Sequence, residues 1–249
     1  MVQSGLHPIC LPGGGSRVPV EGVVGVAVVE FFFDPMCPWA YRTSRWIREV
    51  RQATGLDIRW RFFSLEEINR EEGKPHPWER PWSYGFSQLR VAALLRRDGE
   101  HVVDRWYAAV GAAFFDRGEP TFTPEGAADV LGALGLDRGL VAAALADAST
   151  AAEVRADHDL LVTRFGGHGV PTLVFPDEPA QAFFGPVVLT PPSGPAAVRL
   201  WELVEGWRSF PDLFELRRPK TDVDMAAIGA AFDTYLTARR WRTVAHPAR

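Results

Sequence analysis

Cysteine is scarce in this sequence: two occur among 249 residues, Cys10 and Cys37. So few cysteines exclude a fold that is held together by a disulfide framework. Lysine is equally scarce, since Lys74 and Lys220 are the only two among 27 basic residues, and no basic run exceeds two arginines. Together with a net charge of −4, this pattern indicates a mixed, solvated surface and argues against nucleic-acid binding.

Long apolar runs are also missing. No stretch approaches the ~18 apolar residues that a transmembrane helix needs, so we expect no membrane association. Residues 1–25 carry neither a basic segment nor an unbroken apolar core and read as a flexible extension, which argues against a secretory signal. We therefore expect a cytoplasmic protein, and its wealth of arginine, alanine and glycine is typical of a high-GC bacterial genome.

Motifs for metals and nucleotides are absent as well. The glycine runs lack the strand and helix context of a phosphate-binding loop. The histidines show no metal-ligand spacing, so we expect no metal site. They are His7, His76, His101, His158, His168 and His246.

A β-α-β unit opens the folded part. The run "VAVVEFFF", residues 26–33, is apolar without alternation, which is typical of a strand buried on both faces. Residues 38–55 have helical spacing, start with a proline and stop at a glycine. Residues 57–63 alternate as a second strand does.

Helical patterns then dominate for about a hundred residues. Thr123 before Pro124 predicts one helix start, and Thr150 with Glu153 in capping-box spacing predicts another. Strand signals return at 171–175 and 181–185, separated by a turn-like "PDEPA". An amphipathic helix follows at 195–210, and the tail holds a further helical pattern.

These patterns predict an α/β chain in four parts. Residues 1–25 form an N-terminal extension. Residues 26–65 and 166–219 form one discontinuous α/β domain, residues 66–165 form a helical insertion domain, and residues 220–249 form a tail with a helix.

Cys37 sits where the first strand passes into the first helix. A sulfur at a helix start faces unpaired N–H groups and the positive end of the helix dipole. Such sites lower the pKa of a thiol from ~8.5 to as little as ~3.5. We therefore expect Cys37 to be a reactive thiolate near neutral pH, and the competing interpretation is an inert buried cysteine.

A second feature is the Val170–Pro171 pair, which follows the glycine-rich "GGHG" and precedes a strand. A cis peptide bond is plausible at an X-Pro pair in such a turn.

The two features together resemble the thioredoxin-like superfamily, whose active-site cysteine opens the first helix and faces a cis-proline loop. The long helical insertion resembles the DsbA branch. The blocks "FDPMCPWAYRTSRWIREV", "FSLEEIN", "QAFFGPVV" and "LWELVEGWRSFPDLFELRRPKT" are similar to actinobacterial DsbA-like proteins that include the mycothiol-dependent reductases. They fall within residues 30–219 and leave the N-terminal extension and the tail uncovered.

The resemblance implies a thioredoxin fold with a large all-helical insertion. It implies that Cys37, in the motif Cys37–Pro38–Trp39–Ala40, is the nucleophile, and we expect Trp39 to cover its sulfur. The departure is Ala40, because the dithiol members carry a second cysteine there. Without that cysteine the motif forms no internal disulfide, and a small thiol from solution has to resolve a mixed disulfide on Cys37.

The resemblance also implies a cis-proline loop of Val170, Pro171 and Thr172, and a substrate-side polar group at Asn69. His168, on the same loop, is a candidate for stabilising the thiolate, although an exposed loop histidine is equally compatible with the pattern.

Arg42, on the first helical turn after the motif, is a candidate for steering anionic substrates. Cys10 lies 27 residues before Cys37 on a glycine-rich stretch, and we interpret it as a chance cysteine that does not resolve the mixed disulfide.

The leading hypothesis is a monothiol oxidoreductase with no tightly bound cofactor. It uses a low-molecular-weight thiol, mycothiol or glutathione, as co-substrate. Its other substrate is a protein mixed disulfide or a small electrophile, and a homodimer is compatible with the sequence. One alternative is an enzyme similar to kappa-class glutathione transferases and 2-hydroxychromene-2-carboxylate isomerases, which activate a bound thiol. Another is a binding module that has lost turnover.

Overall fold

The computed structural model describes residues 27–177 and 179–238. A four-stranded sheet lies at its centre, in the order β2-β1-β3-β4. The strands are β1 (Val28–Phe33), β2 (Asp57–Phe62), β3 (Thr172–Phe175) and β4 (Gln181–Phe184). β1 pairs with β2 in parallel and with β3 antiparallel, and β4 pairs antiparallel with β3.

Burial along the strands follows from their place in the sheet. β1 is an interior strand, and five of its six residues are buried. β2 is an edge strand, so its apolar residues alternate with exposed or half-buried polar ones. The apolar run and the alternating run of the sequence predicted these two environments correctly.

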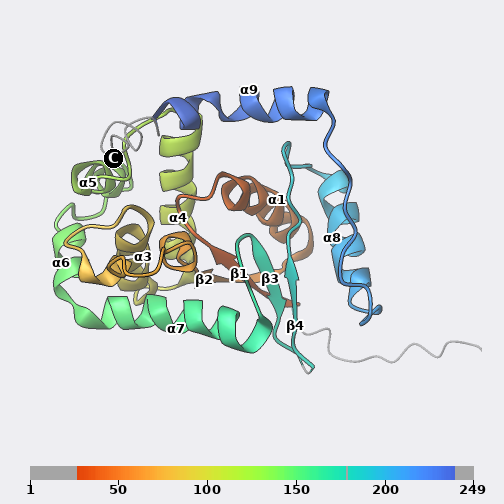
Figure 1. The fold of residues 1–249 in the computed structure, drawn as a ribbon, viewed down its shortest axis with the longest axis horizontal. Coiled ribbons are helices and arrows are strands. Elements are labelled where there is room, and N and C mark those ends of the chain that lie inside the picture. Colours follow the sequence, from red (N-terminus) through yellow and green to blue (C-terminus); the bar gives the residue numbers. More distant parts are fainter. Residues whose placement is uncertain (1–26, 178, 239–249) are drawn as a thin grey trace, which may run out of the picture.

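Helices lie around the sheet on several sides (Figure 1). Helix α1 (Pro38–Thr54) connects β1 to β2, and α8 (Pro195–Trp207) packs beside it. The Trp46 indole N–H donates to Ala197 O at 2.9 Å, and its ring lies 6.3 Å from that of Trp201. Trp201 in turn contacts Phe175 of β3 at 5.6 Å between ring centroids. These contacts fix α1, and therefore its first turn, against the sheet.

The segment between β2 and β3 is helical, as the sequence predicted. In Figure 1 most of its helices gather on one side of the molecule, and α7 runs along the end of the sheet. Its elements are α2 (Leu65–Ile68), the 3₁₀ turn η1 (Pro77–Glu79), α3 (Tyr84–Arg96), α4 (Glu100–Gly111), the π-helical turn η2 (Ala112–Asp116), α5 (Pro124–Ala133), α6 (Leu140–Ala146) and α7 (Ala148–Phe165). The sequence patterns did not single out α2, η1 or α6, which are short.

The two predicted helix starts in this segment had different outcomes. Thr123 caps α5 as predicted, accepting the N–H of Gly126 at 3.0 Å. The prediction for Thr150 was wrong, because Asp147 caps α7 and accepts the N–H of Ser149 at 2.9 Å.

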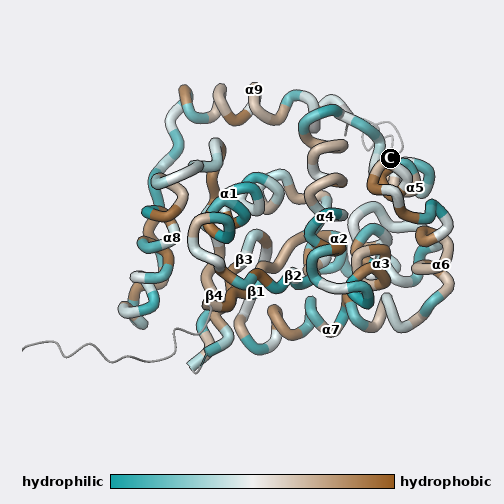
Figure 2. The backbone as a smooth tube through the Cα atoms, turned by 180° about the vertical axis from the view of Figure 1, so that it is seen from behind, coloured by the Kyte–Doolittle hydropathy of each residue, from teal (hydrophilic) through white to brown (hydrophobic). Residues whose placement is uncertain are grey.

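The tail helix is α9 (Asp222–Ala238). Both views place it along one edge of the molecule, above α1 and α4 (Figure 1; Figure 2). The predicted N-terminal extension and Cys10 lie outside the described residues, and the four-part domain division stays a prediction.

Candidate active site

Cys37 is the N-cap residue of α1. The chain leaves β1 at Phe33 and turns through Asp34, so that the Cys37 N–H donates to Asp34 O at 2.9 Å. The Cys37 Sγ accepts the N–H of Ala40 at 3.4 Å. Pro38 stands in the first helical position, where a missing N–H leaves no intrahelical bond unmade. The strand and the proline together place the sulfur at the N-terminal end of α1.

The cis-proline loop meets Cys37 from 133 residues away. The Val170–Pro171 peptide bond is cis, and the Cys37 Sγ donates to Val170 O at 3.3 Å. Thr172 fixes the loop by donating its hydroxyl to Gly169 O at 2.8 Å. The structure therefore brings together the two sequence features that were the basis of the resemblance.

The prediction of a lowered thiol pKa was wrong. Cys37 is only 5% exposed, and burial raises its pKa to about 12. The backbone N–H groups of Ala40 and Trp39 favour the thiolate, but they offset only part of the desolvation, and the charge of Asp34 disfavours the thiolate further. In this closed arrangement Cys37 is a protonated thiol.

Asp34 is a site residue that the sequence analysis missed. Its carboxylate is fully buried, and it accepts the N–H of Met36 and the N–H of Leu65, both at 2.7 Å. These two bonds tie the β1–α1 turn to the start of α2. Burial nevertheless raises the pKa of Asp34 to about 7. An acid just before a helix-opening cysteine was the available signal.

A second apolar cluster lies beside the motif. Its buried members are Tyr41, Phe114, Phe115 and Phe232, and Met36, Trp39, Phe122, Leu189 and Ile228 are half-buried against them. Trp39 also packs against the main core. Met36 and Trp39, one position before and two positions after Cys37, therefore pack on this cluster, whereas Cys37 belongs to the main core.

Three other predicted residues lie in different places. His168 is exposed on the cis-proline loop, and its ring lies 5.0 Å from that of Phe184. Asn69 is exposed at the end of α2 and donates its amide to Leu65 O at 2.8 Å, so its side chain is turned back onto its own helix. Arg42 is half-buried and donates to two main-chain carbonyls, Leu189 O at 2.6 Å and Ala231 O at 2.8 Å. These two bonds hold the guanidinium on the chain itself, and steering of anionic substrates by Arg42 stays a prediction.

Comparisons with known proteins identify the family of this chain. Residues 36–218 match the family model described as "Rv2466c-like: Mycothiol-dependent nitroreductase Rv2466c". The chain belongs to this family. A curated relative, the uncharacterized protein Rv2286c of Mycobacterium tuberculosis, is 48% identical over 219 residues, which cover 88% of this chain and 94% of the relative.

Solved structures show that this Rv2466c-like chain has the thioredoxin fold with a DsbA-like helical insertion. The probable DsbA oxidoreductase SCO1869 of Streptomyces coelicolor has a TM-score of 0.53 at 22% identity, covering 78% of this chain and 93% of that one. A 2-hydroxychromene-2-carboxylate isomerase has a TM-score of 0.53 at 18% identity, covering 73% and 95%. At such identities the likeness concerns the fold alone.

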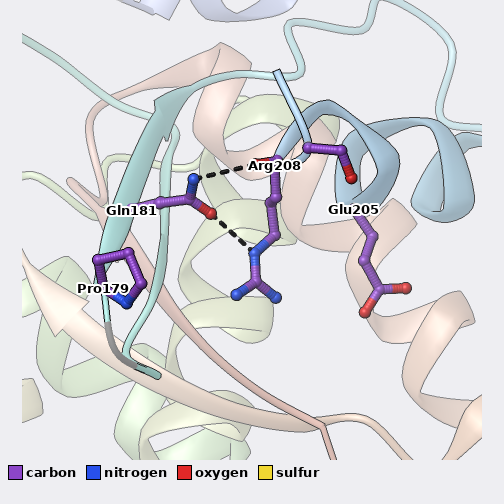
Figure 3. A pocket seen from close by; sticks show the side chains of 5 residues that line it. Pro179, Gln181, Glu205 and Arg208 are labelled. Carbon is purple, nitrogen blue, oxygen red and sulfur yellow. Dashed lines mark hydrogen bonds between the residues drawn. The ribbon is translucent and has the colours of Figure 1, made fainter. Parts of the chain in front are cut away.

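Figure 3 shows a surface hollow of this Rv2466c-like protein. It is lined by residues at the start of β4 and the end of α8, whereas Cys37 lies near the beginning of β3. Two of its polar side chains are paired with each other: Arg208 Nε donates to Gln181 Oε1 at 3.0 Å, and Gln181 Nε2 donates to Arg208 O at 3.1 Å.

The described part of the chain shows no group of three or more potential metal ligands. Within residues 27–177 and 179–238 no helix is long and apolar enough to cross a membrane.

Proposed function

We propose that this protein is a monothiol oxidoreductase in which Cys37 forms a mixed disulfide with a low-molecular-weight thiol, mycothiol. Family membership supports thiol-dependent redox chemistry. The single observation that carries the proposal is the position of the Cys37 sulfur, between the first turn of α1 and the carbonyl of Val170. Ala40, beside it, offers no second sulfur.

The reaction is a pair of thiol–disulfide exchanges. The Cys37 thiolate attacks a protein–mycothiol disulfide, forms a bond to the mycothiol sulfur, and releases the protein thiolate. A second mycothiol then attacks this mixed disulfide, which frees Cys37 and yields mycothiol disulfide. Over the two exchanges, one mycothiol thiol and one protein–mycothiol disulfide become one protein thiol and one mycothiol disulfide. The proton of the attacking mycothiol passes to the released protein thiolate, and Cys37 ends as it began.

The raised pKa makes deprotonation of Cys37 the demanding step of this reaction. The thiol must lose its proton before it attacks, and the sulfur must become hydrated for its pKa to fall. Turnover therefore includes opening of the site. Opening is also needed because a substrate cannot reach the buried sulfur.

The raised pKa also favours a second candidate function. A protonated sulfhydryl at this position can donate a hydrogen bond to the sulfur of a bound thiol cofactor and favour its ionisation. In that case Cys37 acts as a donor and is never oxidised, as in the transferase and isomerase class of reaction.

One experiment separates the two candidates. Reduced protein is incubated with mycothiol disulfide, and intact mass with peptide mapping locates the adduct; Cys10→Ser is the control for the other cysteine. The monothiol route predicts one adduct on Cys37, reversed by mycothiol, and a loss of about 1000-fold or more in disulfide reduction for Cys37→Ser. Reduction of mycothiol disulfides that survives in Cys37→Ser, with no adduct on the wild type, would contradict the route and support the donor role.

A further inference from the structure

Helix α9 lies outside the segment that the family model matches, which ends at residue 218. It is joined to α8 by an exposed connection, residues 209–221. Figure 2 shows α9 extending along the edge of the molecule on the side of α1 and α4, and it packs against η2. This helix therefore adds a surface next to the thiol site that the matched segment does not contain.

Two residues of α9 contact the first turns of α1 directly. The ring of Phe232 meets that of Trp39 edge-on, at 4.8 Å between centroids and 87° between planes. The Arg42 guanidinium lies 4.9 Å from the centre of the same Phe232 ring and donates to Ala231 O at 2.8 Å. Trp39 and Arg42 stand two and five positions after Cys37, so α9 is fastened to the active-site motif itself.

The sulfur is closed in this arrangement. Cys37 is 5% exposed, and both residues that flank it, Met36 and Trp39, pack against the second apolar cluster that contains Phe232. Thiol–disulfide exchange needs a reagent in line with the sulfur. A reactive conformation must therefore displace part of this cover.

Helix α9, which meets the motif through this cluster, is only shallowly embedded. Among its side chains of described burial, Phe232 is buried at 7% exposure, three are half-buried and the others are exposed. Val223 and Met225, for example, are 79% and 54% exposed. Elements with few buried apolar contacts open at low free-energy cost while the core stays folded.

We propose that α9 is a removable cover of the thiol site, in which Phe232 limits the size of the reagent that reaches Cys37 and Arg42 fastens the helix to α1. As a cover of a redox thiol it rests on the proposed function. With α9 in place, small reagents reach the sulfur through modest side-chain movement. Bulky ones need the Phe232–Trp39 contact to break.

The test compares two alkylating reagents on the full-length protein: iodoacetamide, which is small, and fluorescein maleimide, which is bulky. The rate of modification of Cys37 is followed by peptide mapping at pH 9. We expect Phe232→Ala to accelerate the bulky reagent at least fivefold and the small one less than twofold. Phe232→Leu retains an apolar contact, so its rate with the bulky reagent should lie between those of the wild type and Phe232→Ala.

The matched control is Met225→Ala, which removes a large apolar side chain from an exposed position of the same helix and should leave both rates unchanged. A general loss of stability would accelerate both reagents by the same factor. Equal rates in wild type and Phe232→Ala, or equal acceleration of the two reagents, would overturn the cover.

The outcome is independent of the redox proposal, because alkylation needs no turnover. Size-dependent acceleration without any mycothiol adduct would leave the cover standing and reject the proposed function. A mycothiol adduct on Cys37, with no difference between the two alkylating reagents, would support the proposed function and reject the cover.

Discussion

At the scale of single residues, the site is governed by burial. Cys37 and Asp34 both lie away from water, and burial raises the pKa of the thiol to about 12 and that of the carboxyl to about 7. Each charge disfavours the other group's ionisation, because the low-dielectric surroundings transmit it. Above pH 7 a charged Asp34 therefore opposes formation of the Cys37 thiolate.

The first prediction concerns this coupling. Asp34→Asn removes the negative charge at every pH, so the pKa of Cys37 falls and the midpoint of its alkylation moves to lower pH. At pH 9 we expect alkylation by iodoacetamide to be about three- to tenfold faster, since one pKa unit corresponds to a factor of ten in thiolate. Asp104→Asn, which loses ion pairs to Arg48 and Arg51 elsewhere on α1, should leave the midpoint in place. An unshifted midpoint in Asp34→Asn would refute the coupling.

The same carboxyl predicts a pH dependence of stability. The native state keeps the Asp34 proton up to about pH 7, whereas the unfolded chain loses it near pH 4. Below pH 4 the stabilising contribution of this proton is fully present, and it is lost as the pH rises from 4 to 7. Urea unfolding of the wild type should show this fall in free energy of unfolding, and Asp34→Asn should show a smaller one. Parallel pH profiles would contradict the assignment.

At the scale of elements, the start of α1 decides which redox chemistry is available. Ala40 is buried, and its N–H reaches the sulfur of Cys37 at 3.4 Å. The backbone geometry that lets the sulfur cap the helix also places the side chain of position 40 next to it. The sequence change from cysteine to alanine, and no change in the fold, separates this site from a dithiol one.

Ala40→Cys should therefore restore a dithiol site. On mild oxidation we expect an internal disulfide between positions 37 and 40, detected as a loss of two mass units and of both alkylation sites. A mixed disulfide with mycothiol should then be released without added thiol. Thr43→Cys, on the next turn of α1, is the control and should give no such crosslink. A persistent mixed disulfide in Ala40→Cys would show that the two sulfurs do not meet.

The contact between α1 and α4 depends on a glycine. A Cβ at Gly111 would lie 2.1 Å from Tyr41 Cδ2, well inside contact distance. Gly111→Ala should therefore cost about 2 kcal/mol of unfolding free energy, as overpacked sites do, measured by urea denaturation. Gly206→Ala, in α8 with no atom near its Cβ, is the matched control and should gain up to about 1 kcal/mol. A neutral Gly111→Ala would mean that Tyr41 moves freely.

At the scale of the whole molecule, a buried acid joins the helical segment to the sheet. Asp157 of α7 accepts the Phe62 N–H at 3.1 Å and forms ion pairs with Arg61 and Arg96, at 3.2 and 2.6 Å. Arg61 is also paired with Glu30 of β1. One side chain thus links α7 with β2 and α3, and through Arg61 with β1.

Asp157→Ala should cost about 3 kcal/mol, because it leaves the buried Phe62 N–H without its acceptor and two half-buried guanidinium groups without this carboxylate. Equilibrium unfolding in urea measures the loss. Asp129→Ala breaks an exposed ion pair with Arg138 and should cost less than about 1 kcal/mol. Equal losses of unfolding free energy in the two variants would contradict the linking role of Asp157.

Local patterns of the sequence were sufficient for most elements. The unbroken apolar run predicted the interior strand β1, because a strand covered on both faces needs no polar side, and Thr123 predicted the start of α5 through its cap. Thr150 failed as a cap because the helix already begins at Ala148, capped by Asp147, and the Thr150 hydroxyl donates back to Ala144 O and Asp147 O. Short elements such as α6 gave no signal, because seven residues span barely two turns.

The sequence predicted the main residues of the candidate site but not the burial around them. A cysteine before Pro38 and a proline before β3 were visible in the chain, and both lie where the resemblance placed them. The pKa of Cys37 was not, because the groups that exclude water from its sulfur come from loops and helices far along the sequence. Arg42 lies near the motif in sequence, yet its partners are the carbonyls of Leu189 and Ala231, which only folding brings within reach.

The sequence by itself determined the order of strands and helices along the chain, the position of a cysteine at a helix start, and the presence of alanine at position 40. These follow from periodicity, caps and residue identity, which act over a few positions. Tertiary structure alone decided that the sulfur is closed and protonated, that Asp34 stands beside it, and that α9 packs against Trp39 and Arg42. The desolvation of an atom depends on all the groups packed around it, and these groups come from segments far apart in the sequence.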